Sequence, residues 1–478
     1  MLFASIPFAC FFIVFFLLYW YVFDGNLKLQ NLLILTGSYV FYAWWDWRFL
    51  FLLAGSSIIS YFLGIGIATA GNKRRSILVW IGILQGLACL LFFKYFNFLV
   101  GPITGAFAWF NIQVDLHTLD IILPLGISFY TFRIISYLLD IKNNKIQPAT
   151  NLVTYCSYIA FFPGLIAGPI DRPKTLIPQL EKQRVFDYSQ AMDGLSQILW
   201  GLFKKVVIAD NCATFTNDVI SHYTTLPASA LLISMALFAI QVYADFSGYS
   251  DMAIGLASLL GFKITRNFNY PFFAQNIADF WRRWHISLTS WLTDYVFTPL
   301  SVYLRDYGKF GLILAILINF TLIGIWHGAN WIFVFFGFLN GCLYIPLILN
   351  GTLNKKKKNT QGGFVIFLNI AGMFILLMFT FLIFRADNMA QAFDYYSRLF
   401  SPSLFKTFVV TEKVNMAAAL LAIVIMLCAE WKQRDKEHAL QMDNVEKKGL
   451  KVVIYYSLVL FILVFSATNI TDFVYFKF

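Results

Sequence analysis

The sequence predicts an all-α protein that crosses a membrane many times, and three observations carry this prediction. Hydrophobic residues make up 59% of the 478-residue chain. Charged residues make up 13%, whereas soluble domains have roughly 25%. The mean hydropathy is +0.69. Because a membrane helix needs roughly 20 apolar residues, the chain has room for about a dozen spans, and we expect about 11–13.

The expected spans are long apolar runs separated by short polar breaks. The first run is too long and too aromatic for a signal peptide and lacks a basic start, so we expect it to be retained as a span. The runs lie near 3–23, 30–45, 49–70, 76–100, 121–141, 191–210, 228–260, 311–326, 330–349, 363–384, 414–430 and 451–468.

Two segments do not fit a straight helix. The run 155–169 contains two prolines and two glycines, which break helices, so we expect a re-entrant or half-buried segment. The segment 261–310 is interrupted by Gly261, Pro271 and Pro299, and predicts short helices that lie in the membrane plane or dip inward.

Basic clusters set the expected orientation. The clusters Lys73–Arg75, Lys355–Lys358 and Lys432–Lys451 are placed in the cytoplasm because positive loops stay there. The span count between them then puts both termini outside. Such loops also explain the net charge of +11, so we expect no nucleic-acid partner.

We expect one membrane domain over 1–478. Its parts are N-terminal helices (1–120), a core that carries the chemistry (121–350) and C-terminal helices (351–478). The motifs of common soluble enzymes, such as GxSxG, the P-loop and HExxH, are missing. The six cysteines show no CxxC or zinc spacing, so no metal site is expected.

His327 is the first candidate catalytic residue. It lies in IWHGANW between two long apolar runs, and an ionisable group at membrane depth predicts a functional site. An imidazole can take a proton from an attacking hydroxyl, which accelerates acyl transfer roughly 10²–10⁴-fold. The alternative is a core histidine satisfied by a backbone carbonyl.

His285, in FWRRWHISLTSW, is the second candidate. It would orient a substrate or polarise a carbonyl; the alternative is a structural residue. The flanking arginines and tryptophans also fit an interfacial belt.

Two carboxylates, Asp245 and Asp251, interrupt an apolar run. Buried carboxylates need a cation or water. We expect a structural ion pair or a wet cavity, with Arg266, Arg282 or Arg283 as the cation.

These segments together resemble the membrane-bound O-acyltransferase family, in its bacterial branch of alginate and peptidoglycan O-acetylation proteins and teichoic-acid D-alanyl transfer proteins. The resemblance is carried, in order, by LPLGISFYTF (123–132), 161–172, GLFKK (201–205), YADFSGY (243–249), 267–271, 279–288, WHG (326–328) and FRA (384–386). Arg133 and Gly164 depart from it, because each stands where glutamine is expected, and both could alter the cavity lining.

The resemblance implies a ring of tilted helices around a central tunnel, with His327 as the catalytic histidine and His285 at the family's second polar position. The expected substrate-binding or tunnel residues are Trp326, Asn330, Asp245, Ser247, Tyr243, Asn267, Asn269, Trp281 and Trp284.

The resemblance also implies an enzyme of the bacterial inner membrane. It would pass an acyl group, expected to be acetyl, from a cytoplasmic donor such as acetyl-CoA, with no permanently bound cofactor. The expected partners are membrane lipid, the donor and a separate extracytoplasmic acetyltransferase that modifies an alginate-like polysaccharide or peptidoglycan. Two alternatives stay open: a proton-coupled transporter or flippase using His327 and Asp245, and an acyltransferase acting on teichoic acid, lipid or protein.

Overall fold

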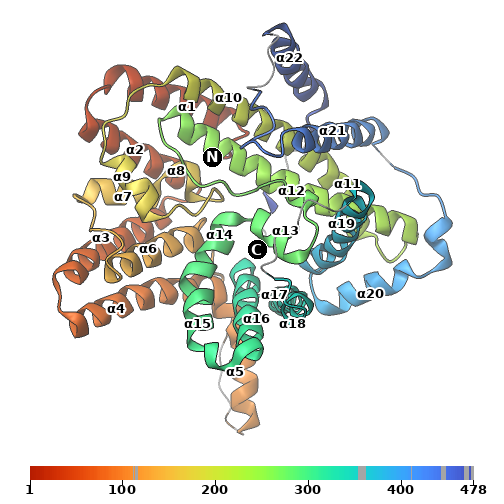
Figure 1. Cartoon of the computed structure of the whole chain (residues 1–478), viewed down its shortest axis with the longest axis horizontal. Coiled ribbons are helices and arrows are strands. Elements are labelled where there is room, and N and C mark those ends of the chain that lie inside the picture. The colour runs from red at the N-terminus through yellow and green to blue at the C-terminus, as the bar shows by residue number, and fades with distance from the viewer. Residues whose placement is uncertain are drawn as a thin grey trace. The chain divides into compact units, whose positions relative to one another are not determined.

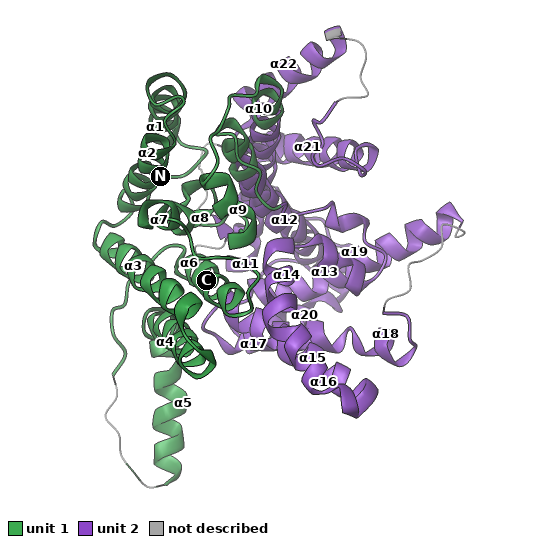
Figure 2. Cartoon of the chain, turned by 60° about the vertical axis from the view of Figure 1, so that its left-hand side comes forward, with its two compact units in different colours: residues 1–194, 253–265 green, residues 195–252, 266–478 purple. Residues whose placement is uncertain are grey.

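The computed structural model describes residues 1–110, 112, 117–353, 362–410, 412–442, 448–467, 473 and 474. Every regular element within these residues is helical (Figure 1), which confirms the all-α prediction. The contacts of the chain divide it into two compact units (Figure 2): unit 1 comprises 1–194 and 253–265, and unit 2 comprises 195–252 and 266–478. The expected three-part division of a single domain stays a prediction.

The helices of unit 1 are α1 (Ile6–Leu17), the π-helix η1 (Leu18–Val22), α2 (Leu27–Ala43), α3 (Arg48–Thr69), α4 (Asn72–Leu90), the π-helix η2 (Leu91–Tyr95), α5 (Phe96–Trp109), α6 (Ile127–Lys142), α7 (Leu152–Ala160), α8 (Phe162–Leu165) and α9 (Pro173–Leu180). Two helices contribute to both units: α10 (Tyr188–Phe203) and α12 (Ala228–Leu259).

The remaining helices belong to unit 2. They are η3 (Lys204–Ala209), α11 (Asp210–Ser221), η4 (Pro271–Phe273), α13 (Ile277–Arg283), α14 (Ile286–Leu292), η5 (Thr293–Phe297), α15 (Thr298–Tyr303), η6 (Arg305–Tyr307), α16 (Gly308–His327), α17 (Trp331–Cys342), α18 (Ile345–Leu349), α19 (Gly363–Arg385), α20 (Met389–Leu399), η7 (Pro402–Phe405), α21 (Lys413–Lys432) and α22 (Lys448–Phe465).

The chain is a multi-pass membrane protein. Within the described residues, seven helical segments are long and apolar enough to cross a bilayer, and each overlaps a run expected from the sequence. They are Arg48–Thr69, Asn72–Trp109, Ala228–Leu259, Arg305–His327, Trp331–Leu349, Gly363–Arg385 and Lys413–Lys432. The apolar helices Ile6–Val22 and Gly449–Phe465 are shorter. The expected total of 11–13 spans, the central tunnel and the position of the termini stay predictions.

The expected span 121–141 starts later in the structure. Helix α6 begins at Ile127, because Gly126 takes a left-handed conformation (φ 70°) that interrupts the helical backbone. Nearly all of α6 is buried, so its apolar sequence reflects packing within unit 1, against α3 and α4.

The run 155–169 is irregular, as its prolines and glycines predict. Helix α7 ends at Ala160, α8 lasts four residues, and 166–172 is not helical. All residues of the run are buried, so protein covers this non-helical backbone.

Arg133 of α6 supports this irregular segment. Its guanidinium donates to the carbonyl oxygens of Tyr158 (3.2 Å), Ile159 (3.1 Å) and Pro169 (3.4 Å). It also lies 3.7 Å from the Asp171 carboxylate, and both side chains are fully buried. A Cβ added at Gly164 would collide with the same guanidinium. The two departures from the family pattern are therefore one arrangement: Arg133 occupies the space that a side chain at 164 would need. We expected both positions to affect a cavity lining. In the structure, Arg133 instead connects α6 to the backbone of the irregular segment.

In unit 2, α16 and α17 form a tightly packed hairpin. A Cβ at Gly324 would collide with the Phe333 carbonyl oxygen, and one at Gly337 with the Phe320 carbonyl oxygen. These two glycines allow the helix backbones to touch, which fixes the helix end that carries His327.

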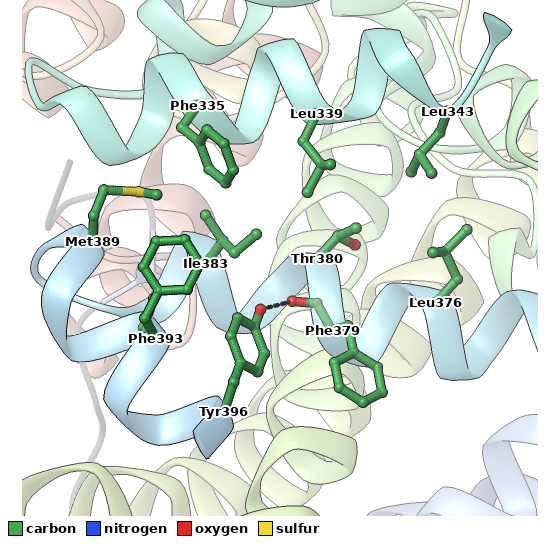
Figure 3. A pocket seen from close by; sticks show the side chains of 11 residues that line it. Phe335, Leu339, Leu343, Leu376, Phe379, Thr380, Ile383, Met389, Phe393 and Tyr396 are labelled. Atoms are coloured by element: carbon green, nitrogen blue, oxygen red, sulfur yellow. Dashed lines mark hydrogen bonds between the residues drawn. The ribbon is translucent and has the colours of Figure 1, made fainter. Parts of the chain in front are cut away.

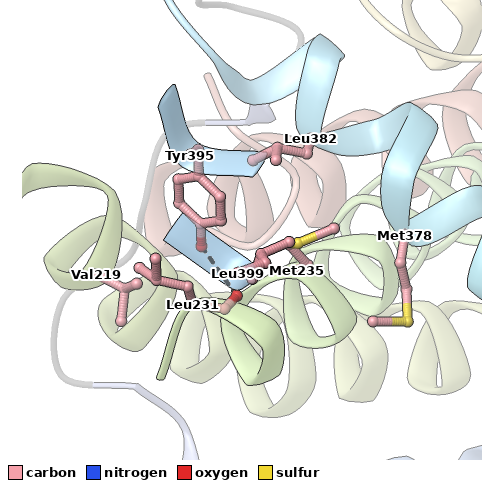
Figure 4. Packing of buried hydrophobic residues seen from close by; sticks show 7 residues of the cluster. All are labelled: Val219, Leu231, Met235, Met378, Leu382, Tyr395 and Leu399. Carbon is pink, nitrogen blue, oxygen red and sulfur yellow. Dashed lines mark hydrogen bonds between the residues drawn. The ribbon is translucent and has the colours of Figure 1, made fainter. Parts of the chain in front are cut away.

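A buried apolar cluster joins α11, α12, α19 and α20 (Figure 4). Its members are Val219, Leu231, Met235, Met378, Leu382, Tyr395 and Leu399. The Tyr395 hydroxyl donates to the Leu231 carbonyl oxygen at 2.9 Å, so its polar atom is satisfied inside the cluster.

Between α12 and α16 the chain forms only short helices, from η4 to η6, as the broken pattern of 261–310 predicts. Tyr270 (φ 48°) and His285 (φ 45°) both adopt the left-handed conformation in this segment. Such a backbone costs a non-glycine residue about 1–3 kcal/mol and is often found at functional sites.

The basic cluster Lys73–Arg75 lies at the start of α4, with Lys73 and Arg74 exposed. The expected cluster Lys355–Lys358 lies outside the described residues, and Lys432–Lys451 is described only in part.

Candidate active site

His327 is the last residue of α16 and is 4% exposed. Its imidazole packs against three aromatic rings, with centroid distances of 5.1 Å to Trp326, 5.1 Å to Phe384 and 6.3 Å to Phe336. The hairpin of α16 and α17, together with α19, therefore holds this histidine in an aromatic enclosure inside unit 2.

His285 is fully buried at the junction of α13 and α14. Its Nδ1 lies 3.2 Å from the Asn267 side-chain oxygen, and its ring packs edge-on against Phe246, with centroids 4.7 Å apart. The junction lies outside the seven candidate spans. Burial lowers the pKa of His285 to about 3, so its imidazole is neutral at physiological pH.

Trp326 links the two histidines. Its ring centroid lies 5.5 Å from that of His285 and 5.1 Å from that of His327, in edge-to-face arrangements. The structure thus brings together the two residues that the sequence singles out, although 41 residues separate them in the chain.

Asn267 and Asn269 hold the His285 junction. The Asn267 carbonyl oxygen accepts from the Ile286 N–H (2.8 Å), and the Asn269 N–H donates to the Arg283 carbonyl oxygen (2.9 Å). The short stretch 267–269 therefore pairs with the chain on both sides of His285.

The other expected aromatic and amide residues have structural contacts. Trp281 donates from its indole nitrogen to the Asn340 side-chain oxygen at 3.3 Å. Trp284 stacks on Phe280, with centroids 5.4 Å apart. Asn330 caps α17 by accepting from the Ile332 N–H (3.1 Å) and donates to the Asp387 carbonyl oxygen (3.0 Å).

The expected partners of the α12 carboxylates are wrong. We expected an arginine from 266, 282 or 283, but lysines of η3 take this place: Lys205 lies 2.8 Å from Asp245, and Lys204 lies 2.6 Å from Asp251. The reason is close helix packing. A Cβ at Gly201 would approach the Gly248 carbonyl oxygen to 2.5 Å, so the backbone of α10 lies against that of α12.

Tyr243 and Ser247 belong to the same polar network. The Tyr243 hydroxyl donates to the Glu430 carboxylate at 2.9 Å, and the Lys204 ammonium donates to the Ser247 hydroxyl at 2.9 Å. Asp245 also accepts from the Val474 N–H at 2.8 Å. These contacts describe a structural network, and a role of these residues in substrate binding stays a prediction.

Sequence reasoning missed Glu430 and Asp210. Glu430 of α21 is 1% exposed and lies 3.9 Å from Lys204, and Asp210 lies 2.8 Å from Lys205. A signal for Glu430 is present in the sequence, because it is a single acidic residue at the end of a long apolar run.

A cavity of about 410 Å³ lies in the described part of unit 2, and its lining includes neither histidine. It contains Ile286, the residue after His285, and Ile323, one helical turn before His327. Its polar groups include the Arg282 guanidinium, the Asp294 carboxylate, the Asn319 amide and the Thr289 hydroxyl, and its walls include Trp281 and Phe320. The Asn319 side chain is 7% exposed, and its oxygen has no hydrogen-bond partner among the described residues. A cavity with a cation and an unsatisfied amide can hold a polar ligand.

A second pocket, of about 290 Å³, is formed by α17, α19 and α20 (Figure 3). Its lining is apolar apart from Thr380 and Tyr396, and both hydroxyls donate to backbone oxygens, those of Leu377 and Phe379. It therefore offers less to a polar substrate than the first cavity.

Comparison with known proteins identifies the family. The sequence model of the membrane-bound O-acyltransferase family matches residues 142–384. The chain is 37% identical over 408 residues to a probable alginate O-acetylase AlgI of Azotobacter vinelandii, covering 84% of this chain and 78% of the relative. It is 34% identical over 403 residues to a peptidoglycan O-acetyltransferase of Helicobacter pylori, covering 77% and 73%.

The chain belongs to the membrane-bound O-acyltransferase family. It is therefore an O-acyltransferase enzyme, which confirms the family and the activity class expected from the sequence. A teichoic acid D-alanyltransferase of Bacillus subtilis is more distant, with 28% identity over 243 residues, 49% of this chain and 61% of the relative.

Within this O-acyltransferase, the matched region 142–384 contains both histidines and Asn267. Glu430 of the lysine network lies beyond it. The roles of individual residues in acyl transfer stay predictions.

Proposed function

We propose that this chain passes an acetyl group from a cytoplasmic donor across the bacterial inner membrane, for O-acetylation of an exported polysaccharide. The observation that carries the proposal is the pair of buried imidazoles that both pack against Trp326, together with a cavity whose lining includes Ile286 and Ile323, near His285 and His327 in the chain. The names of the relatives, an alginate O-acetylase and a peptidoglycan O-acetyltransferase, support the acceptor class.

In this proposal acetyl-CoA is a substrate, and its acyl end occupies the 410 Å³ cavity. The exposed Arg282 at the cavity attracts the phosphates of the donor, because guanidinium groups pair well with phosphate. The thioester carbonyl then lies beside His327, and no permanently bound cofactor takes part.

His327 acts as the general base. Its neutral imidazole removes the proton of the acceptor hydroxyl while the oxygen attacks the thioester carbonyl. The carbon–sulfur bond then breaks, the thiolate leaves, and the imidazolium returns the proton to the sulfur. An ester forms and free thiol is released, so charge and atoms balance.

The proposed orientation has both termini outside and the basic cluster Lys73–Arg75 in the cytoplasm. The acetyl ester of the acceptor is then presented on the outer side, where a separate extracytoplasmic acetyltransferase transfers the acetyl group to a hydroxyl of the polymer, either an alginate-like polysaccharide or peptidoglycan, and returns the acceptor hydroxyl. If this chain, purified alone, acetylated sugars and co-purified with no such enzyme, the partner would be unnecessary.

The test is the O-acetyl content of exported polysaccharide and peptidoglycan in cells with wild-type protein or His327→Ala at matched membrane abundance. We expect His327→Ala to lose at least 10²-fold in transfer rate, as for loss of a general base. His222→Ala is the matched control, because His222, which follows α11, has a 64% exposed side chain and we expect wild-type ester content. Unchanged ester on every polymer in His327→Ala would contradict the proposal.

A further inference from the structure

Asn267 presents an oxygen, not an amide nitrogen, to His285. The Ser287 backbone N–H can only donate, and it points to the Asn267 Oδ1 at 3.3 Å, which identifies that atom as the oxygen. The Ser287 hydroxyl donates to the same atom at 2.9 Å. At the other end of the amide, Nδ2 donates to the Ser250 hydroxyl at 3.2 Å. The amide orientation is therefore fixed by a backbone group.

This orientation fixes the protonation of the imidazole. A carbonyl oxygen only accepts, so the His285 Nδ1, 3.2 Å away, must carry the proton and donate. A neutral imidazole has one proton on nitrogen, so Nε2 carries a lone pair. Asn267 and His285 are both fully buried, and bulk water therefore does not compete for this bond.

The backbone strengthens the constraint. His285 has a strained left-handed conformation, and the Ile286 N–H next to it donates to the Asn267 carbonyl oxygen at 2.8 Å. The main chain and the side chain of Asn267 thus both contact the junction that carries His285.

We infer that Asn267 is a positioning residue that holds His285 in the Nδ1–H form, so that Nε2 accepts a hydrogen bond from an O–H or N–H group of a substrate. The sequence leaves two roles open for His285, orienting a substrate or polarising a carbonyl. An unprotonated Nε2 cannot donate to a carbonyl oxygen, so the geometry selects the first role. The inference rests on the proposed function for its substrate, a hydroxyl acceptor or the amide-containing arm of the donor.

The direct test is nitrogen NMR of the ¹⁵N-histidine-labelled protein in lipid nanodiscs. The chain has five histidines, and the His285 signals are assigned by their loss in His285→Gln. We expect a protonated Nδ1 and an unprotonated Nε2 in the wild type. The opposite tautomer would overturn the inference.

Substitutions of Asn267 test its role. Asn267→Leu removes the acceptor, so we expect a mixture of tautomers and a fall in kcat with little change in KM. Loss of the group that fixes an imidazole tautomer lowers kcat by up to about 10⁴-fold where histidine is the base, and we expect a fall of about 10²-fold for a histidine that orients the substrate. Asn267→Asp keeps an acceptor, so it should keep the Nδ1–H form and restore much of kcat.

Ser250→Ala is the control. It removes the contact at the amide nitrogen but leaves the Ser287 N–H on the oxygen, so the tautomer should not change. A wild-type tautomer in Asn267→Leu would overturn the inference. If Asn267→Leu does not fold, the tautomer of His285 in the wild-type protein still tests it. The tautomer is measured without substrate, so absence of any transferase activity would refute the proposed function while this result stands.

Discussion

At the scale of single residues, unit 2 contains charged side chains that are buried in its interior. Lys205 is held between Asp210 and Asp245, at 2.8 Å from each, and all three side chains are at most 8% exposed. Charges in such surroundings are tolerated only when they are paired and hydrogen-bonded. Removing one partner therefore costs more than the pair itself contributes.

Asp245→Asn should destabilise the protein by about 3–5 kcal/mol, because it removes a carboxylate from a buried ion pair. The expected result is a lower thermal midpoint and less folded protein in detergent, measured by fluorescence-detected size-exclusion chromatography after heating.

Asp394→Asn is the matched control for this substitution. Asp394 pairs with Arg398 one helical turn away, but both side chains are more than one-third exposed. Exposed pairs contribute about 0–1 kcal/mol, so the thermal midpoint should hardly move. Equal shifts of the thermal midpoint in Asp245→Asn and Asp394→Asn would contradict the expectation that a buried ion pair is more costly to break than an exposed one.

Sequence reasoning at this scale identified which residues are unusual but not their partners. His327 and Asp245 stand out because their neighbours are mostly apolar, and polar groups at such positions are costly, whereas His285 stands out by its tryptophan-rich setting. The cation of Asp245 is 40 residues away in the sequence, and only the packing of η3 against α12 makes Lys205 its partner. Arginines nearer in the chain were therefore a wrong choice.

At the scale of elements, Arg133 closes a helix end inside the protein. The last carbonyl oxygens of a helix have no partner within it, and those of Tyr158 and Ile159 accept from Arg133 at the end of α7. The positive charge also suits the negative end of the helix dipole. Helices α7 and α8 are short, so the hydrogen bonds from Arg133 hold backbone groups that a longer helix would pair within itself.

Gly164→Ala should destabilise unit 1 by about 1–3 kcal/mol, because its new methyl group collides with the Arg133 guanidinium. In the Arg133→Gln background the collision is relieved, so the same substitution should cost less. A double-mutant cycle on thermal unfolding measures this coupling, which we expect to be about 0.5–3 kcal/mol.

Gly372→Ala serves as the comparison for the cycle. Gly372 lies in α19, and a Cβ there meets nothing within 4 Å, so it should not be coupled to Arg133. If Gly164→Ala lowered the free energy of unfolding equally with and without Arg133, the two positions would not be coupled and the predicted collision would be wrong.

The elements themselves were largely predictable. Long apolar runs predicted the seven helical segments of the described residues that can cross a bilayer, because a helix is the one way for a single segment to satisfy its backbone in lipid. Helix α6 starts later than expected because Gly126 interrupts it. The arrangement around Arg133 was not predictable, because no pattern in the sequence near Gly164 indicates that the guanidinium of Arg133 fills the space beside it.

At the scale of the whole molecule, the amino-acid composition was sufficient to predict a multi-pass membrane protein. The basic clusters in addition predict a topology that can be tested. In a background without native cysteines, Arg74→Cys should react with a membrane-impermeant maleimide only after the cells are permeabilised. Thr407→Cys, in the stretch between η7 and α21, should react in intact cells. Both side chains are exposed, so access to the reagent depends on the side of the membrane.

The reverse labelling pattern would invert the topology and place the donor side outside. Labelling of both cysteines in intact cells would mean that Lys73–Arg75 does not lie in the cytoplasm, and the orientation proposed from the charge rule would fail.

The lysine network also affects how the protein is made. Lys204 and Lys205 leave the ribosome first, Asp245 and Asp251 follow on α12, and Glu430 comes last on α21. A buried charge is tolerated only when it is paired. Lys204 and Lys205 therefore lack the carboxylates of Asp251 and Asp245 until α12 has been synthesised. Synthesis of α21 completes the network, so the C-terminal helices finish the assembly of a site that lies far upstream in the chain.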